Sequence, residues 1–268
     1  MGVQMRSSLT QLLRYAAAYA NDAAARRFGD RVPYVYVAEF PRSGANWIRD
    51  LAGDVLQLPV PRFGMFPVTF RAILQTHSAV PIRGPKIIYL VRDGRDVFVS
   101  HYYKTVNSFL AGGPSTASRV RRIHPSVVGA SANGLRNDSR FEAFYREWRV
   151  RSLGSRVGWG RHVETWTDLA TPETLIVRYE DMRTDPKETL ARIVRHLSNA
   201  EPAEYLLDFA IRRNAFEEKT GRKPGVVDDA SNRRSGAIGG WRGVLSEPLL
   251  QAFQDDFGPV LAKFGYNS

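Results

Sequence analysis

The sequence predicts a single α/β domain with a parallel central sheet flanked by helices. Three short apolar segments, at residues 34–40, 86–91 and 175–179, each lead into a polar turn and then a helical pattern. Strands that alternate with helices in this way are typical of βαβ units, whose parallel sheet is covered on both faces. The chain has 268 residues, of which 43% are hydrophobic, so it can build a full core. We therefore assign residues 1–268 to one domain.

The first predicted strand runs into a loop that opens a helix. Residues 34–40 are rich in β-branched and aromatic side chains, as buried strands are. The Pro-Arg-Ser-Gly run at 41–44 is typical of a turn, and a helical pattern follows over residues 45–58. Its apolar positions, spaced for one helix face, are Trp47, Leu51, Val55 and Leu58.

Two further strands are followed by similar turns. Residues 86–91 form a continuous apolar run, and the turn after them offers Asp93 or Asp96 as the cap of the next helix. Residues 175–179 form the third strand, and a helix is expected over residues 186–197.

Two regions lie outside this alternating pattern. The apolar spacing in residues 1–28 predicts a helical extension, which either packs on the domain or contacts a membrane surface. Residues 111–139 are rich in Gly, Ser and Asn around a basic cluster at 119–122, so we expect a long mobile loop. The apolar positions that recur in the N-terminal helix are Leu9, Leu12, Leu13, Ala16, Ala20 and Ala23.

The composition is strongly basic and lacks cysteine. The net charge is +11, and 32 of the 38 basic residues are arginine, whose planar fork pairs with phosphate or carboxylate. This favours an anionic partner such as nucleic acid, a membrane surface or a phosphorylated small molecule, or else a solvated basic surface. The absence of cysteine excludes disulfides, thiol nucleophiles and thiolate metal sites, and it is compatible with the cytoplasmic location that we expect. No apolar stretch approaches the ~20 residues that span a bilayer.

Two segments have the features of anion sites. The loop at residues 41–47 leaves a strand and opens a helix, so its backbone N–H groups and the helix dipole favour an anion. Arg42 and Ser43 add donors, and Gly44 allows close approach of a ligand. A Walker A loop is absent, so no hydroxyl is placed to hold Mg²⁺.

The second candidate site follows the next strand. Arg92 stands at the carboxyl end of that strand, where ligands of open α/β sheets bind, and Ser100 lies two helical turns further on. A phosphate could lie between them. By spacing alone, a surface pair between Arg92 and Asp96 is an equal alternative.

Four segments together resemble the soluble sulfotransferases that use 3′-phosphoadenosine 5′-phosphosulfate (PAPS). Residues 41–47 (Pro-Arg-Ser-Gly-Ala-Asn-Trp) resemble the family's loop for the 5′-phosphosulfate, and residues 86–100 resemble its 3′-phosphate strand and helix. Thr76-His77 resembles its catalytic histidine segment, and residues 234–241 resemble its C-terminal Arg-Lys-Gly element. The resemblance extends from about residue 33 to 266 and implies a P-loop nucleotide-kinase-like sulfotransferase fold.

The resemblance also implies roles for individual residues. His77 would be the general base that activates an acceptor hydroxyl, and Arg42 would neutralise charge on the leaving phosphate. No metal is implied. The residues that would bind PAPS are Arg42, Ser43, Gly44, Ala45, Asn46, Trp47, Arg92, Ser100, Tyr179, Phe216, Arg234, Ser235 and Gly236.

Some positions depart from the family pattern. Gln75 stands where Lys often precedes Thr-His, which removes a second cation near the sulfuryl group, and Ser235 also replaces Lys.

The expected reaction is transfer of a sulfuryl group to a hydroxyl or amine of a small-molecule, glycan or lipid acceptor, with no nucleic-acid partner. The alternatives are a nucleotide-binding, P-loop-like kinase and a non-catalytic binder of anions or nucleic acid. Some aromatic residues hint at an apolar or aromatic acceptor, although core packing explains them equally well: Phe63, Phe66, Phe70, Tyr102, Tyr103 and Phe109.

Overall fold

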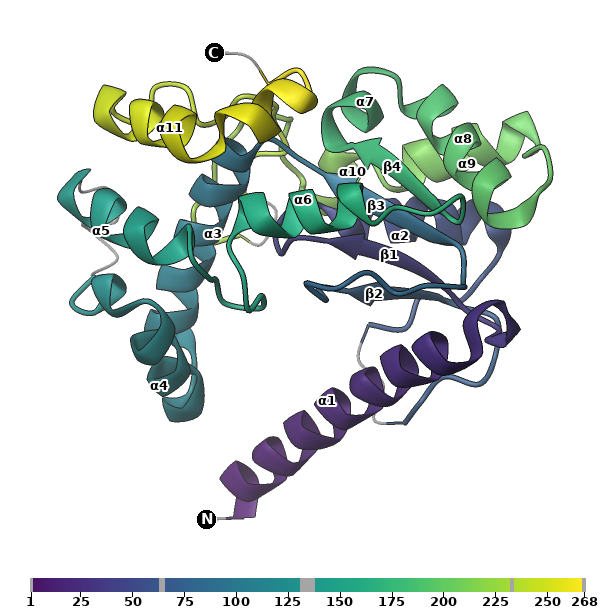
Figure 1. Ribbon diagram of the computed structural model, residues 1–268, viewed down its shortest axis with the longest axis horizontal. Coiled ribbons are helices and arrows are strands. Elements are labelled where there is room, and N and C mark those ends of the chain that lie inside the picture. Colours follow the sequence, from purple (N-terminus) through teal and green to yellow (C-terminus); the bar gives the residue numbers. More distant parts are fainter. Residues whose placement is uncertain (1, 63–65, 131–137, 232–233, 267–268) are drawn as a thin grey trace.

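A four-stranded parallel sheet forms the centre of the molecule (Figure 1). The computed structural model describes residues 2–62, 66–130, 138–231 and 234–266. The strand order is β2-β1-β3-β4, and each neighbouring pair is parallel, as the sequence predicted. The strands are β1 (Val35–Glu39), β2 (Ile73–Thr76), β3 (Ile87–Val91) and β4 (Thr174–Arg178).

Alternate side chains of the strands enter two separate cores, one on each face of the sheet. Every residue of β3 is buried, because this strand lies inside the sheet and is covered on both sides. Val37 of β1 and Ile88 of β3 belong to one core, whereas Tyr36 and Tyr89 belong to the other. The period of two along each strand thus produces the layered α/β arrangement.

Helices cover both faces of the sheet (Figure 1). One core is completed by α2 (Ala45–Leu56), α7 (Tyr179–Thr184), α8 (Pro186–Ser198) and α9 (Glu204–Arg213). The other is completed by α3 (Gly94–Ala111), α5 (Asp138–Trp148), α6 (Trp159–Asp168) and α11 (Glu247–Lys263). The remaining helices are α1 (Gly2–Phe28), α4 (Pro114–Ile123) and α10 (Phe216–Thr220), with short 3-10 turns at Gly29–Arg31 and Pro125–Val127.

The strands that were predicted are present, but the sequence analysis did not identify β2. This strand is only four residues long, and its second half is the polar pair Gln75-Thr76. A short edge strand of this kind lacks the long apolar run by which buried strands are recognised. Its position matters because it ends directly before His77.

The loop expected over residues 111–139 contains a helix, and this corrects the sequence prediction. Pro114 occupies the first turn of α4, where its missing N–H costs nothing, and Val120 anchors the helix in the core. The Gly-Gly-Pro run that indicated a loop is in fact the junction of two helices, with Gly112 as the C-cap of α3, Gly113 as the N-cap of α4 and Pro114 as its first residue. Residues 131–137 lie outside the described part of the chain.

The N-terminal helix α1 spans the range that the sequence indicated. It contacts the domain through Ala17, Asn21 and Ala25, which are buried. The tyrosine hydroxyl of Tyr34 donates to the Asn21 carbonyl at 2.9 Å. In the described part of the chain, no helix is long and apolar enough to cross a membrane.

We expect Phe98→Ala to lower the free energy of unfolding by about 3–5 kcal/mol, because it opens a cavity in a tightly packed aromatic cluster. The Phe98 ring lies 5.4 Å from Trp148 and 5.6 Å from Phe253, centroid to centroid. Urea unfolding measures the change. Phe209→Ala, at a half-exposed position on α9, is the matched control and should cost far less; equal losses would contradict this assignment of the core.

Candidate functional site

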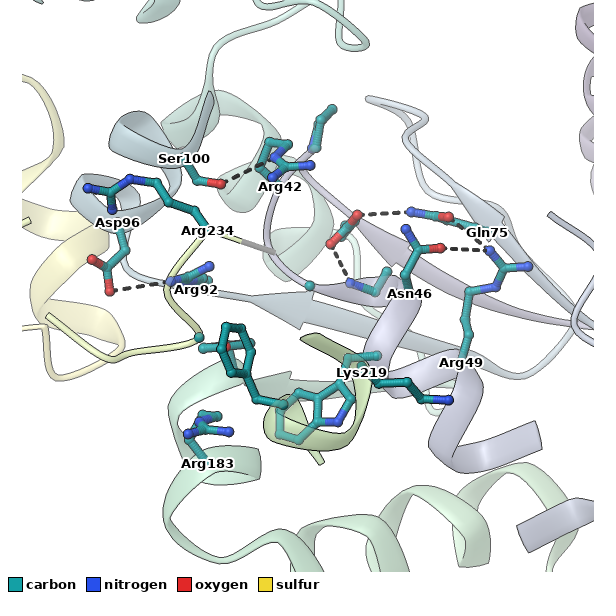
Figure 2. Close-up of a pocket in the computed structure, with 18 of the residues that line it drawn as sticks. Arg42, Asn46, Arg49, Gln75, Arg92, Asp96, Ser100, Arg183, Lys219 and Arg234 are labelled. Atoms are coloured by element: carbon teal, nitrogen blue, oxygen red, sulfur yellow. Dashed lines mark hydrogen bonds and ion pairs between the residues drawn. The ribbon is translucent and has the colours of Figure 1, made fainter. Parts of the chain in front are cut away.

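A cleft of about 610 Å³ opens where β1 and β3 end (Figure 2). This is the edge at which ligands of open parallel sheets bind. The lining includes every residue that the sequence analysis assigned to the donor or to catalysis except Ser43, namely Arg42, Gly44, Ala45, Asn46, Trp47, His77, Arg92, Ser100, Tyr179, Phe216, Arg234, Ser235 and Gly236. Segments that are far apart in the sequence therefore meet at one cleft.

The loop after β1 is held in an unusual backbone conformation. Gly44 has φ of 115°, and a Cβ there would lie 2.9 Å from the Tyr179 ring, so only glycine fits without displacement. Arg42 also has a positive φ, 81°, which costs free energy for a residue with a side chain. Ser43 does not line the cleft, because its hydroxyl is buried and donates to the Phe40 carbonyl at 2.8 Å.

The Arg42 and Ser100 side chains meet across the cleft. Arg42 Nε donates to Ser100 Oγ at 3.2 Å, which joins the loop after β1 to the helix after β3. Burial lowers the pKa of Arg42, and the nearby Arg92 lowers it further, whereas Glu39 raises it. Two guanidinium groups thus lie close enough to repel each other, a situation that an anion between them would relieve.

Arg92 is fixed at the end of β3 by contacts on several sides. Its Nη2 donates to the Ala237 carbonyl at 3.2 Å and lies 3.7 Å from the Asp96 carboxylate. Its guanidinium carbon lies 4.3 Å from the centroid of the Tyr179 ring. Burial disfavours its charge, but Tyr179, Asp96 and other nearby acids outweigh this, and the pKa of Arg92 is raised. The pair with Asp96 is therefore buried, rather than the surface pair considered as an alternative.

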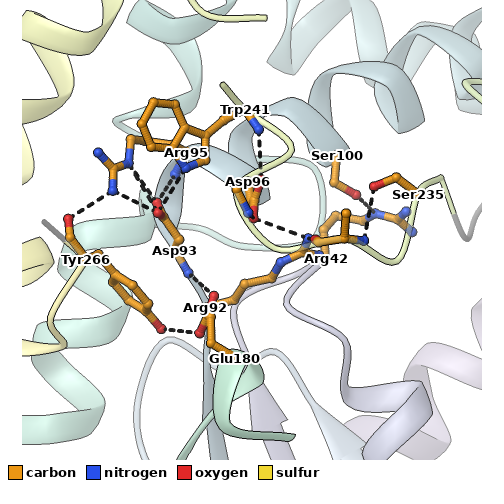
Figure 3. Close-up of polar contacts among 12 residues, drawn as sticks. Arg42, Arg92, Asp93, Arg95, Asp96, Ser100, Glu180, Ser235, Trp241 and Tyr266 are labelled. Carbon is orange, nitrogen blue, oxygen red and sulfur yellow. Dashed lines mark hydrogen bonds and ion pairs between the residues drawn. The ribbon is translucent and has the colours of Figure 1, made fainter. Parts of the chain in front are cut away.

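Buried carboxylates attach the C-terminal segment to the start of α3 (Figure 3). Asp93 caps α3 by accepting from the Arg95 amide, and it also accepts from the Trp241 indole at 3.1 Å. Asp96 accepts from the Gly239 and Trp241 amides at 2.9 and 3.0 Å. This attachment brings Arg234, Ser235 and Gly236 beside Arg92, although more than 140 residues separate them.

An aromatic wall forms the opposite side of the cleft. Trp47 and Tyr179 meet edge to face, with ring centroids 5.8 Å apart. The Trp47 indole donates to the Asn214 carbonyl at 3.0 Å, which fixes the ring. Phe216 packs so closely under Gly236 that a Cβ there would lie 2.4 Å from its ring. A flat apolar group such as a nucleobase could pack among these rings.

The imidazole of His77 is oriented by the end of β1. Its Nδ1 lies 3.2 Å from the Glu39 carbonyl oxygen. A carbonyl only accepts, so this contact requires the proton on Nδ1 and leaves Nε2 as the basic nitrogen. The Glu39 carboxylate lies 3.9 Å from the same Nδ1.

A chain of polar contacts continues from Glu39 to a buried arginine (Figure 2). The Glu39 carboxylate accepts from the Ala45 amide at 2.7 Å and from Gln75 Nε2 at 2.9 Å. Gln75 Oε1 in turn accepts from Arg49 Nη1 at 2.9 Å. Arg49 is only 2% exposed, and burial lowers its pKa to about 10. The neutral Gln75 therefore links a buried anion to a buried cation beside His77.

The sequence analysis missed several residues that line the cleft. Glu39 and Arg49 gave no signal because they lie inside a predicted strand and a predicted helix, where side chains are expected to serve packing. Arg183 lies in the short helix α7, which begins at Tyr179, and Lys219 lies in the short helix α10. Arg62 and Asn214 were also missed, whereas Pro41 and Asp96, which line the cleft too, were named in the sequence only as a turn residue and as a helix cap or ion-pair partner.

Other candidates lie away from the cleft. Tyr102 and Tyr103 are buried in the aromatic core, so core packing, and not an acceptor pocket, accounts for them. Phe109 packs against the same core, while Phe66 and Phe70 are exposed and Phe63 is outside the described residues. Among the described side chains, no group of three His, Asp or Glu is arranged to hold a metal ion.

Comparison with known proteins identifies the fold and the family. Residues 67–265 match the sulfotransferase domain model. Sulfotransferase 1A1 of Canis lupus familiaris is 21% identical over 272 residues, which cover 85% of this chain and 83% of the relative. Sulfotransferase 2A1 of Rattus norvegicus is 26% identical over 190 residues, which cover 67% of this chain and 57% of the relative.

Solved structures share the same architecture. Mouse sulfotransferase SULT7A1, solved as a complex with PAP, aligns with a TM-score of 0.64 at 17% identity over 92% of this chain and 91% of its own. Retinol dehydratase, solved with androsterone and the inactive cofactor PAP, aligns with a TM-score of 0.62 at 18% identity over 92% and 85%. The family match spans most of the chain, and so the protein belongs to the sulfotransferase family.

Proposed function

We propose that this protein transfers a sulfuryl group from PAPS to a hydroxyl or amine of an acceptor, with His77 as the general base. The observation that carries the proposal is the convergence of Arg42, Arg92 and Arg234 on one cleft that also has an aromatic wall. A nucleotide with phosphates at both ends of its ribose would complement this combination. The names of the structural relatives, solved with PAP (adenosine 3′,5′-bisphosphate), support the same ligand.

The residues present fit such a donor. The cleft volume of about 610 Å³ lies within the range of nucleotide-sized sites. Arg92 Nε is buried without a hydrogen-bond partner, as expected for a donor atom that awaits an anionic ligand. Arg92, Ser100, Arg234, Ser235 and Gly236 would hold the 3′-phosphate. Tyr179, Phe216 and Trp47 would contact the adenine, and Arg42, Gly44, Ala45 and Asn46 would surround the 5′-phosphate.

Each catalytic residue would act through a specific atom. When bound, PAPS supplies an activated sulfuryl group. His77 Nε2 would take the proton of the acceptor hydroxyl, because Nδ1 already donates to Glu39. The Glu39 carboxylate, 3.9 Å from Nδ1, would stabilise the imidazolium that this transfer creates. Arg42 would stabilise the charge that develops on the 5′-phosphate.

The proposal is less specific for the acceptor than for the donor. The relative crystallised with androsterone and retinol in two structures is a precedent for small-molecule ligands in this fold. We propose a small-molecule, glycan or lipid acceptor, reached from the side of Glu39, Gln75 and His77. A cytoplasmic location stays a prediction from the absence of cysteine.

We expect adenosine 3′,5′-bisphosphate to raise the melting temperature far more than adenosine 5′-monophosphate does. The reason is that Arg92 and Arg234 would contact only the 3′-phosphate, and each charge-assisted bond contributes on the order of 1.5–3 kcal/mol. Differential scanning fluorimetry measures both shifts. Arg92→Ala or Arg234→Ala should weaken the bisphosphate about tenfold or more while leaving the monophosphate shift unchanged. Equal shifts for both nucleotides in the wild type would exclude this donor site.

His77→Ala should lower turnover by at least about 100-fold, because the acceptor would lose its general base. The bisphosphate-induced shift in melting temperature should persist, since His77 would not hold the nucleotide. Transfer of labelled sulfate from PAPS to a panel of phenols, alcohols and amines measures turnover. Retention of wild-type turnover in this variant would remove His77 from the mechanism.

Glu39→Gln should separate donor affinity from turnover. The substitution removes a buried negative charge beside the loop that would bind the phosphosulfate, so we expect bisphosphate affinity to rise by about tenfold. Turnover should fall, because the His77 imidazolium would lose its partner. Isothermal titration and kinetic assays measure the two effects. Glu201→Gln, at an exposed position, is the control and should change neither; weaker binding of the bisphosphate by the Glu39 variant would contradict the proposed charge relationship.

A further inference from the structure

An apolar face of α1 points into solvent. The side of α1 that packs on the domain is a narrow stripe of small residues, Ala17, Asn21 and Ala25, spaced at four-residue intervals. The large apolar side chains that are described in the same helix are exposed, with Leu12 at 64% and Tyr19 at 78%. The exposed set on this helix also includes Leu9, Leu13 and Tyr15. The leucines of the apolar repeat that predicted this helix are therefore not on its buried face.

This orientation is fixed by specific contacts in the second half of the helix. The Asn21 side chain accepts from the Val68 amide at 2.8 Å. Arg26 donates to the Pro81 and Val80 carbonyls at 2.7 and 2.8 Å. The first half of α1 extends beyond the sheet (Figure 1). The polar contacts and the small-residue stripe together set which face of α1 is presented to solvent.

Positive charge accompanies the apolar face. The sequence of α1 contains four arginines and one acid, Asp22, whose carboxylate is turned to the domain and accepts from Thr76 Oγ1 at 3.2 Å. Helix α4 contacts α1 through a side-chain hydrogen bond, in which Arg119 donates to the Tyr15 hydroxyl at 2.8 Å. Arg121 and Arg122 are exposed in the last turn of α4.

Acidic residues are missing from this part of the sequence. There is no Asp or Glu between Asp96 and Asp138, which includes all of α4 and most of α3. A second copy of this chain would bring the same arginines against one another, and like charges disfavour such a contact. Exposed leucine and tyrosine side chains flanked by arginine instead complement the headgroup region of an anionic bilayer.

We propose that α1 and α4 together bind an anionic lipid surface. Leu9, Leu12 and Tyr19 enter the boundary between headgroups and acyl chains, while Arg121 and Arg122 contact lipid phosphates. The contact is peripheral. It does not depend on donor binding, because none of the described side chains of α1 or α4 lines the cleft.

The position of α1 links this surface to the cleft. Asp22 and Arg26 contact Thr76 and Ser78, the two residues that flank His77. A membrane-bound α1 would therefore hold the segment that carries His77 near the lipid surface. Combined with the proposed function, this favours an acceptor that is itself a lipid or partitions into membranes.

Flotation with lipid vesicles tests the surface. The full-length protein should bind vesicles of phosphatidylcholine and phosphatidylserine, bind phosphatidylcholine alone much less, and be released by salt. Leu12→Gln combined with Tyr19→Gln should weaken binding by about tenfold or more. Arg121→Gln and Arg122→Gln should each weaken it by about fivefold. Tyr205→Gln is the matched control, because Tyr205 is 70% exposed on α9 and should leave binding unchanged.

A second measurement distinguishes a loss of lipid binding from damage to the donor site and from misfolding. The melting shift with adenosine 3′,5′-bisphosphate should be the same in all of these variants as in the wild type. Absence of binding to anionic vesicles, equal binding to neutral vesicles, or an equal loss in the Tyr205 control would each overturn the proposal. So would a dimer in solution that the Leu12 and Tyr19 substitutions dissociate while vesicle binding is absent.

Discussion

Three buried carboxylates hold the positive charge of the cleft in place. Guanidinium groups that gather without a ligand repel one another and lose hydration, so they need fixed anions nearby. Asp96 lies beside Arg92 and also accepts from two backbone amides of the C-terminal segment. Asp93 accepts from Trp241, and Glu180 accepts from the Asp93 amide and the Tyr266 hydroxyl. The same carboxylates therefore counter the charge and fold the end of the chain onto the sheet.

Topology explains why these groups meet at one place. In the order β2-β1-β3-β4, the chain leaves β1 toward one side of the sheet and returns to β3 on the other. The loops after β1 and β3 diverge at this point and leave a crevice between them. The loop at 41–47 and Arg92 lie on its two sides, and the attached segment at 234–236 closes it. If Asp93 and Asp96 did not accept hydrogen bonds from the C-terminal segment, that segment would not close the crevice.

The sequence predicted those parts of the site that depend on backbone geometry. A strand, a glycine-containing turn and a helix imply where free N–H groups point, and so Arg42, Gly44 and Arg92 could be placed at strand ends. Residues whose role depends on tertiary neighbours could not be found in this way. Glu39 and Arg49 read as ordinary positions of a strand and a helix, and only the structure places them together through Gln75.

The sequence misread the segment that contains α4, and it left open which face of α1 is buried. Sequence patterns show that an element has an apolar face, but they do not show which surface will cover it. Two glycines and a proline between α3 and α4 indicated a loop, although proline is well suited to the first turn of a helix. In α1, the apolar repeat predicted the helix, yet the buried side is the one with the small residues Ala17 and Ala25.

Glu39 shows how binding and chemistry can make opposite demands on one residue. A carboxylate that accepts from the Ala45 amide occupies a donor at the start of α2, where the helix dipole favours an anion. The carboxylate therefore gives this amide a hydrogen-bond acceptor while no ligand is bound. It also competes with any phosphate for the same amide. The same group lies 3.9 Å from His77 Nδ1, on the side of the ring away from the proposed basic nitrogen. Arg49, joined to it through Gln75, limits the cost of keeping that charge buried. A neutral residue at position 39 would favour donor binding at the expense of the base.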